Sequence, residues 1–178
     1  MLQNTIGDSP IEMKRKALDC IEWERPMDIA YQWASGEDPV FQRFYAVTEA
    51  YYSRLAGGEA NRRAYIPYNA SAGIPDVALA FCGDQAVGCA GLKPYSDADA
   101  EVKRVWVEPA YRGQGIASAL MDRIEEKARQ MGFRRVILQT RPIMTDAAAL
   151  YEKRGYALIP NYPPYDRLEG AVCYAKAL

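Results

Sequence analysis

The chain has 178 residues, 49% of them hydrophobic and 25% charged, which suits one globular domain with a full-sized core. Its 22 basic residues nearly balance 23 acidic ones, and without a basic run the chain lacks the electrostatic footprint of a nucleic-acid-binding protein. Histidine is absent, which excludes Ser-His-Asp and Cys-His nucleophile systems, HExxH metal sites and imidazole acid-base chemistry.

The N-terminal third predicts a strand, a helix and a loop. The first strand is expected within residues 12–22. The N-terminus, residues 1–4, lacks the charged and apolar regions of a signal peptide. No run is long enough to span a membrane, so we expect a cytoplasmic protein without a membrane partner. A stripe of aromatic residues at helical spacing predicts a helix over residues 39–55 that packs on the core.

A loop and a hairpin follow this helix. Residues 64–75 are rich in turn formers and carry tyrosines that we expect to be exposed, as in loops that wall a binding site. Residues 77–82 and 86–92 predict a hairpin. The four cysteines form no C-x-x-C pair, so we expect reduced, buried thiols and no metal site. A disulfide between Cys82 and Cys89 is the less favoured alternative.

The most informative segment lies between Glu101 and Tyr156 and predicts strand, turn, helix, strand, helix. Gly113 and Gly115 allow the backbone to approach a ligand without Cβ clashes, and the next helix presents free N–H groups that favour an anion. An ordinary strand-helix-strand crossover with a glycine turn is the alternative. The first helix is expected to bury an apolar face formed by Ile116, Leu120, Ile124, Ala128 and Met131. Its charged residues are expected to lie largely outside that face, namely Asp122, Arg123, Glu125, Glu126 and Arg129.

The C-terminal elements follow the same logic. Gly132 ends the first helix, and residues 136–138 read as a buried strand. A second helix is predicted over residues 145–154. The last strands are expected at residues 156–159 and 171–176, joined by a tyrosine-rich loop.

Residues 101–117 resemble the acetyl-coenzyme A motif of the GCN5-related N-acetyltransferases (GNAT), written (Gln or Arg)-x-x-Gly-x-(Gly or Ala). Arg112, Gly115 and Ala117 fill its fixed positions, and residues 147–156 are similar to the family's next helix. The resemblance covers residues 76–178. It implies one acetyltransferase domain over residues 1–178, in which residues 1–75 supply acceptor-side elements and residues 76–178 form the acetyl-coenzyme A-binding core and the C-terminal strands.

The resemblance also implies a fold and a cosubstrate. The expected fold is a mixed α/β domain with a mostly antiparallel, twisted sheet of six to seven strands, one parallel central pair and helices on both faces. Acetyl-coenzyme A would bind where the parallel strands diverge, with its pantetheine arm beside one strand and its pyrophosphate on the backbone N–H groups of the turn. The implied binding residues are Val105, Trp106, Val107, Arg112, Gly113, Gln114, Gly115, Ile116, Ala117 and Ser118.

The resemblance implies an acid and suggests a base. Tyr151 falls where the family often has a tyrosine that protonates the departing thiolate; the alternative is a core aromatic. Glu101 is the expected base, acting directly or through a water; the alternative is a solvent-facing carboxylate paired with Lys103. The N–H of Val107 would polarise the thioester carbonyl. Met144 stands where the family commonly has an Asn or Gln that hydrogen-bonds the cofactor, a contact that Met cannot make.

The acceptor is expected to be a small-molecule amine, because tyrosines of both loops can pack on its carbon skeleton and hold a cationic amine. Alternatively, these tyrosines pack on the body of the protein or on a second subunit of a homodimer. Two other functions stay open. One is a non-catalytic acyl-coenzyme A sensor, and the other is a dinucleotide-dependent oxidoreductase, which Ser118 at the third glycine position disfavours.

Overall fold

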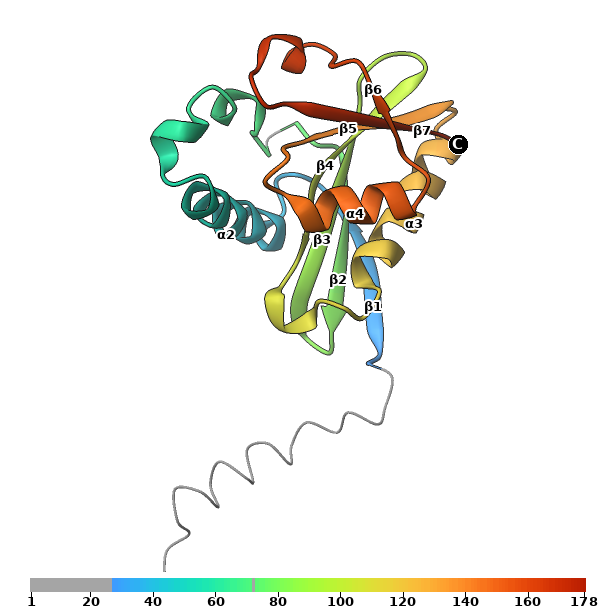
Figure 1. Ribbon diagram of the computed structural model, residues 1–178. Helices are drawn as coiled ribbons and strands as arrows, with labels where there is room; N and C mark the ends of the chain where they lie inside the picture. The colour runs from blue at the N-terminus through green and yellow to red at the C-terminus, as the bar shows by residue number, and fades with distance from the viewer. Residues whose placement is uncertain (1–26, 72) are drawn as a thin grey trace, which may run out of the picture.

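The computed structural model describes residues 27–71 and 73–178 and shows one sheet with strand order β1-β2-β3-β4-β5-β7-β6 (Figure 1). Only β4 and β5 run parallel, and every other neighbouring pair is antiparallel. The predicted mixed sheet is therefore confirmed, and its topology differs from the doubly wound parallel sheet of dinucleotide oxidoreductases. The strands are β1 (Ile29–Ala34), β2 (Asp76–Cys82), β3 (Gln85–Pro94), β4 (Asp99–Val107), β5 (Arg135–Thr140), β6 (Ala157–Ile159) and β7 (Val172–Ala177).

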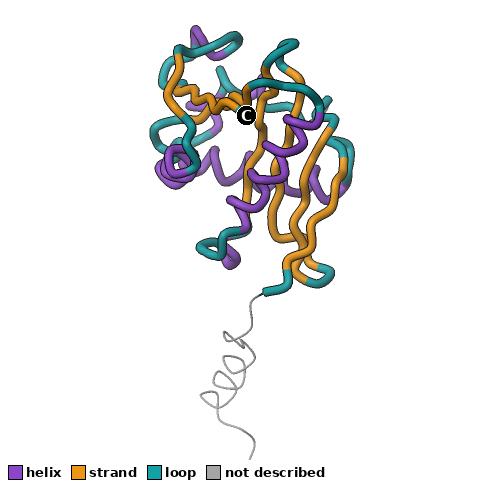
Figure 2. Tube along the Cα trace, turned by 90° about the vertical axis from the view of Figure 1, so that its right-hand side faces the viewer, coloured by secondary structure: helices purple, strands orange, loops and turns teal. Residues whose placement is uncertain are grey.

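Within the described residues, three α-helices cover the two faces of the sheet (Figures 1 and 2). Helix α2 (Pro39–Leu55) packs Phe41 and Phe44 on one face against β2, β3 and Trp106. Helices α3 (Ile116–Gln130) and α4 (Thr145–Lys153) pack on the opposite face, where the larger core lies. The N-terminus of α2 is fixed by Asp38, whose Oδ1 accepts the Val40 N–H at 2.8 Å.

The two parallel strands stay together over a short distance only. Their register joins residues 99–101 of β4 to residues 135–137 of β5. Asp99 and Arg135 clamp this end through two hydrogen bonds of 2.8 Å. Beyond Glu101 the strands part, which leaves one edge of residues 105–107 without a strand partner.

A bulge in β4 accompanies this divergence. Arg104 has a φ of 59°, and the register with β3 shifts between Cys89 and Gly91. Such a bulge bends its strand and increases the local twist. The left-handed backbone is held in place by the Arg104 side chain, which donates to the Asn69 carbonyl and to Glu49 Oε1. The bulge therefore helps to open the space beside β4.

Several details differ from the sequence-based expectations. The strand expected at residues 12–22 lies outside the described residues, whereas β1 was not predicted although Ile29, Tyr31 and Trp33 alternate with polar or small residues. Met131 lies just past the end of α3 and is 42% exposed rather than buried. Glu125 was expected largely off the buried face but is buried, because Arg154, Lys176 and the Tyr156 hydroxyl surround its carboxylate.

Candidate functional site

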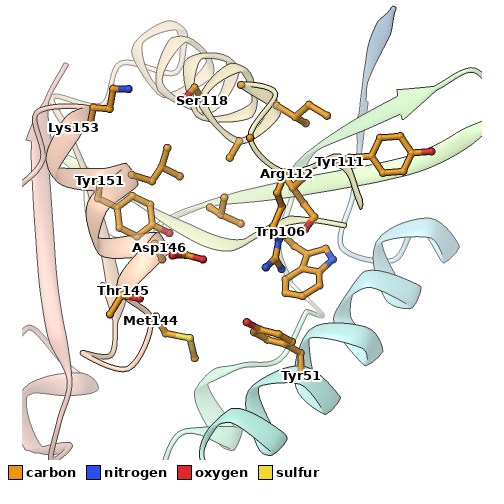
Figure 3. Close-up of a pocket in the computed structure, with 18 of the residues that line it drawn as sticks. Tyr51, Trp106, Tyr111, Arg112, Ser118, Met144, Thr145, Asp146, Tyr151 and Lys153 are labelled. Carbon is orange, nitrogen blue, oxygen red and sulfur yellow. Dashed lines mark hydrogen bonds between the residues drawn. The ribbon is translucent and has the colours of Figure 1, made fainter. Parts of the chain in front are cut away.

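The main cavity has a volume of about 580 Å³ and lies where β4 and β5 diverge. Its walls come from the C-terminal half of β4, the glycine turn, the N-terminal end of α3, helix α4 and the C-terminal half of α2 (Figure 3). The end of β4, the glycine turn and the start of α3 are the elements that the sequence singled out for a cofactor, whereas α2 was expected only to pack on the core. Of the ten predicted cofactor-binding residues, nine line the cavity, namely Val105, Trp106, Val107, Arg112, Gly113, Gly115, Ile116, Ala117 and Ser118.

The glycine turn lines the cavity through Gly113 and Gly115. Gly113 and Gly115 have φ values of 77° and 78°, a region that other L-residues adopt at a cost. A Cβ at either position would meet no atom within 4 Å, so the space beside the turn is open. Within the described chain, the N–H groups of residues 113–115 donate no hydrogen bond. The first N–H groups of α3, which has no side-chain cap, add to this set.

The free edge of β4 also faces the cavity. The Glu108 N–H donates to the Val87 carbonyl of β3 at 2.9 Å, and strand alternation then turns the Val107 backbone groups to the opposite edge. In agreement, the Val107 carbonyl accepts Arg112 Nε at 3.0 Å. The Val107 N–H is therefore directed toward the space that β5 has left.

Aromatic side chains hold Arg112 at the mouth of the cavity. Its Cζ lies 4.8 Å from the centre of the Trp106 ring and 5.6 Å from that of Tyr51. The two rings pack edge to face with centroids 5.0 Å apart. Figure 3 shows these side chains on the wall opposite α4. A guanidinium placed in this way suits a phosphate-bearing ligand.

Tyr151 projects from α4 into the region shared by two cavities (Figure 3). The residue is 7% exposed, and its hydroxyl forms no hydrogen bond with any residue that the structure describes. Burial, with a smaller contribution from Tyr52, raises the pKa of the phenol. The phenol therefore keeps its proton at neutral pH and is available to a ligand. The Tyr151 ring also packs near Tyr156 and Tyr174, as the alternative of a core aromatic residue predicts.

Met144 stands at the N-cap of α4 and lines both cavities. It provides no side-chain hydrogen bond to the first turn of the helix. An Asn or Gln at this position could hydrogen-bond both a ligand in the cavities and the first turn of α4. The thioether of Met144 forms neither bond.

A second cavity of about 120 Å³ adjoins the first. The two share Tyr52, Val105, Met144, Ala147 and Tyr151. The other walls come from residues 62–69, from β4 and from the end of β5. Four of its lining residues are cationic, namely Arg62, Lys103, Arg104 and Arg141.

Glu101 lies behind the wall of this second cavity rather than in it. Its carboxylate is 2% exposed and contacts Lys93 at 3.2 Å and Lys103 at 3.4 Å. The pairing with Lys103 was foreseen, but the carboxylate does not face solvent. Lys103 itself lines the cavity and also contacts Glu101, so it connects the carboxylate to the cavity.

The loop tyrosines pack mainly on the protein. Tyr165 is fully buried and accepts Lys103 Nζ at 2.5 Å, and the Tyr162 hydroxyl donates to Glu101 at 3.1 Å. Tyr65, expected to be exposed, is 7% exposed because its hydroxyl donates to the Glu169 carbonyl at 2.7 Å. The alternative of packing on the body of the protein therefore holds for these three residues, while Tyr68 is exposed.

The cysteines in the described part of the chain are all unpaired thiols. Cys82 lies opposite Gln85 and Cys89 opposite Leu79, so the hairpin register does not bring the two sulfurs together as a cross-strand pair. Burial raises the pKa of the Cys89 thiol, which disfavours the reactive thiolate.

The described residues contain neither a metal-binding cluster nor a helix that could span a membrane. No cluster of His, Cys, Asp and Glu in residues 27–71 and 73–178 could hold a metal ion. No helix in the same part of the chain has the length and apolar character needed to cross a bilayer.

Several residues that line the main cavity were not predicted as site residues from the sequence. Thr145, Asp146 and Lys153 line the cavity from α4 (Figure 3). Tyr52 lines it from α2. Lys153 belongs to the recognised helix motif, so its position on that helix could have been noticed. Tyr52 was counted only as part of an aromatic core stripe, because helical spacing alone cannot separate a core face from a cavity face.

Comparisons with known proteins agree with this geometry. A profile of the Acetyltransferase (GNAT) family matches residues 31–156. The uncharacterized N-acetyltransferase YjgM of Escherichia coli is 36% identical over 75 residues, which cover 40% of this chain and 45% of that protein. An IAA acetyltransferase of Azospirillum brasilense is 36% identical over 80 residues, covering 44% of this chain and 52% of the relative.

A solved structure extends the likeness to most of the fold. The GNAT family acetyltransferase from Elizabethkingia anophelis, determined with acetyl-CoA bound, superposes with a TM-score of 0.58 at 18% identity. The match covers 84% of this chain and 98% of that structure. The alignments with the two sequence relatives span only about half of their lengths, 45% and 52%.

Proposed function

The chain belongs to the acetyltransferase (GNAT) family, and on that premise we propose that it transfers the acetyl group of acetyl-coenzyme A to a small-molecule amine. The acceptor would attack directly, without an acetyl-enzyme intermediate. The observation that supports this proposal best is the position of Tyr151 on the wall shared by the two cavities, where its hydroxyl has no hydrogen-bond partner among the described residues.

The residues of the main cavity fit acetyl-coenzyme A. The open space beside Gly113 and Gly115, together with N–H groups that have no partner among the described residues, suits a pyrophosphate. Residues 105–107 offer the unpaired edge of β4 to the amide groups of a pantetheine arm. Arg112 adds a cation at the mouth of the cavity. When bound, acetyl-coenzyme A supplies the activated thioester, and the chain supplies its position.

Tyr151 is proposed as the acid that gives a proton to the sulfur of the leaving thiolate. Burial raises the pKa of the phenol, so Tyr151 stays protonated and can donate to the nascent thiolate, whose own pKa the same apolar surroundings raise. The Val107 N–H is proposed to hydrogen-bond the carbonyl oxygen of the thioester, where negative charge develops.

Glu101 is proposed as the final proton acceptor for the amine. Because it does not line either cavity, it would act through a water or through Lys103, whose Nζ lies 3.4 Å from Glu101 Oε1. In the second route Lys103 passes a proton to Glu101 and takes one from the amine, so that Lys103 ends as it began.

The N-terminal part of the chain is proposed to form the acceptor side, since Arg62, Tyr65 and Asn69 line the second cavity. Residues 76–178 provide most of the main cavity, to which α2 adds Tyr51, Tyr52 and Leu55. An acetyl-cysteine route is not needed, because the buried Cys89 thiol donates to the Arg104 carbonyl and is held in its protonated form.

The proposal is tested by incubating the protein with acetyl-coenzyme A and a panel of small amines, with free thiol and acetylated amine measured together. Equal amounts of both products, dependent on enzyme and amine, are expected. Binding of acetyl-coenzyme A without turnover of any amine would instead indicate the non-catalytic sensor.

A further inference from the structure

We infer that the second cavity holds the acceptor and that the acceptor is a small amine carrying a carboxylate, which Arg141 binds. The inference rests on the proposed function, because it names the substrate class of the same site. Three observations support it. The cavity is surrounded by positive charge, the Arg141 guanidinium has no acceptor among the described residues, and the cavity is separate from the glycine turn.

The wall of the second cavity is cationic. Arg62, Lys103, Arg104 and Arg141 line it, and none of its lining residues is an Asp or a Glu. Two carboxylates stand behind these cations, namely Glu49 and Glu101. The four cations of the wall therefore outnumber the two carboxylates beside them. Lys93 also pairs with Glu101, so the net charge around the cavity is positive.

Three of the four cations already have partners in the protein. Arg62 and Arg104 both contact Glu49 Oε1, at 2.9 and 2.7 Å. Burial would raise the pKa of Glu49, but these two guanidiniums outweigh it and hold the pKa below its ordinary value. Lys103 donates to Glu101, to Tyr165 and, at 3.1 Å, to the Tyr68 carbonyl. These three acceptors match the three donors of an ammonium group.

Arg141 is the exception. Among residues 27–71 and 73–178, no carboxylate pairs with its guanidinium, and no carbonyl accepts from it. Its Cζ instead lies 4.9 Å from the centre of the Tyr65 ring. That ring is itself fixed by the hydroxyl bond to the Glu169 carbonyl. Arg141 is therefore a partly buried, positioned cation with free donors, an arrangement that suits a bidentate bond to a carboxylate.

The backbone also fixes the position of Arg141. Its carbonyl accepts the Met144 N–H at 2.9 Å in the turn between β5 and α4. The residue thus stands three positions before Met144, the N-cap of the helix that carries Tyr151. An acceptor whose carboxylate lies on Arg141 would extend from there toward Val105 and Tyr151, where the two cavities meet.

The cations of this cavity do not serve the phosphates of the cofactor. The two cavities share five residues at the thioester end, and the second includes no residue of the glycine turn. Arg112 and Lys153 already supply cations to the main cavity. The charge of the second cavity is therefore left for the acceptor.

The same field selects against other amines. Polyamines and other multiply cationic acceptors would meet like charge on entry. For an acceptor that does bind, neighbouring cations lower the pKa of its ammonium group and favour the free amine that attacks the thioester. The small volume, about 120 Å³, suits a molecule of amino-acid size rather than a protein side chain with its backbone.

The first experiment compares matched acceptors at saturating acetyl-coenzyme A, with thiol release as the readout. L-α-Amino acids, their carboxamides and short α,ω-diamines form the panel. We expect kcat/KM for at least one amino acid to exceed that for its carboxamide by about tenfold or more, the factor that about 1.4 kcal/mol represents. Equal or faster turnover of carboxamides or diamines would overturn the inference and leave the transferase proposal standing.

The second experiment uses Arg141→Gln, with Arg63→Gln as a matched control because Arg63 is exposed and lines neither cavity. Arg141→Gln should raise KM for the preferred amino acid about tenfold or more, while the kcat/KM of the carboxamide changes little. Arg63→Gln should preserve the preference. An unchanged preference in Arg141→Gln would overturn the assignment of Arg141.

A binding readout keeps the inference testable if no amine is acetylated. A short carboxylate without an amine, such as propionate, is added to the protein saturated with coenzyme A, and the melting temperature is measured. A rise that Arg141→Gln abolishes and Arg63→Gln retains would support the carboxylate site even if the transferase proposal failed. If propionate does not raise the melting temperature of the wild type and amino acids are not preferred as acceptors, the proposed carboxylate site is wrong.

Discussion

Arg104 Nη1 lies 2.7 Å from Glu49 Oε1, so the bulged residue of β4 is tied to helix α2. The same carboxylate oxygen binds Arg62 at 2.9 Å. Glu49 thus joins three segments around the second cavity, and the left-handed Arg104 backbone depends on a side chain far away in the sequence. The opening between β4 and β5 is in this way connected to the acceptor side of the molecule.

Glu49→Gln should lower the free energy of unfolding by about 2 kcal/mol, because two largely buried guanidiniums lose their shared anion. The pKa of Glu49 is held below its ordinary value of 4.5. Its stabilising contribution is therefore complete above that value and is lost as the pH falls through the folded-state pKa. The melting-temperature gap between wild type and Glu49→Gln should be widest above about pH 5 and shrink below about pH 4.

A suitable control is Glu126→Gln, which removes an exposed pair with Arg129 and should change stability by less than about 0.5 kcal/mol. A gap for Glu49→Gln that does not depend on pH would argue against the ion pairs as its origin.

Gly115→Val should abolish the stabilisation by acetyl-coenzyme A. Gly132→Val is the matched control, because Gly132 has a φ of 86°, also has open space at its Cβ and lies at the other end of α3. Both changes should cost about 1–2 kcal/mol in backbone strain. Only Gly115→Val should lose the ligand-induced rise in melting temperature, and a normal rise would remove the pyrophosphate assignment.

Tyr151→Phe should lower kcat by about a hundredfold or more, the usual contribution of a general acid, with little change in acetyl-coenzyme A affinity. Tyr174→Phe serves as the control, since Tyr174 packs near Tyr151 but donates to Glu152 and lines neither cavity. Stopped-flow or steady-state thiol release gives kcat for both. Unchanged turnover in Tyr151→Phe would exclude the phenol as the acid.

Met144→Asn should add two effects that separate measurements can distinguish. An Asn at the N-cap of α4 can accept an N–H of the first turn, which is worth about 1 kcal/mol and should raise the melting temperature by roughly 2–4 °C without ligand. A new hydrogen bond to the cofactor should also tighten acetyl-coenzyme A binding several-fold in a calorimetric titration. Tighter capping with unchanged affinity would show that Met144 does not contact the cofactor.

The parts of the fold that could be predicted are those with local signals. The helix over residues 39–55 follows from its aromatic spacing and from Gly57 after its end, and the structure places α2 over the same residues. The turn at Gly113 and Gly115 follows from residues that tolerate positive φ. Strand β1 was missed because its alternating pattern is short and amphipathic, and Trp33 stays 47% exposed at the sheet edge.

The parts that could not be predicted depend on contacts between distant segments. Glu101 was placed near the reaction from its strand, but its burial comes from Lys93 on β3 and from Tyr162 in a loop about sixty residues later. No sequence motif around Arg141 indicates the role proposed for it. Its importance arises only when β5, residue 65 and the bulge of β4 come together around one small cavity.

The central claim is that the main cavity binds acetyl-coenzyme A, and the melting temperature with and without this ligand tests it most directly. At about a hundred times its dissociation constant, the ligand should stabilise the folded protein by about 2.7 kcal/mol. For a domain of this size, that corresponds to a rise of roughly 5–10 °C. A rise with acetyl-coenzyme A and none with NAD is predicted, whereas the absence of a rise with acetyl-coenzyme A would contradict the account.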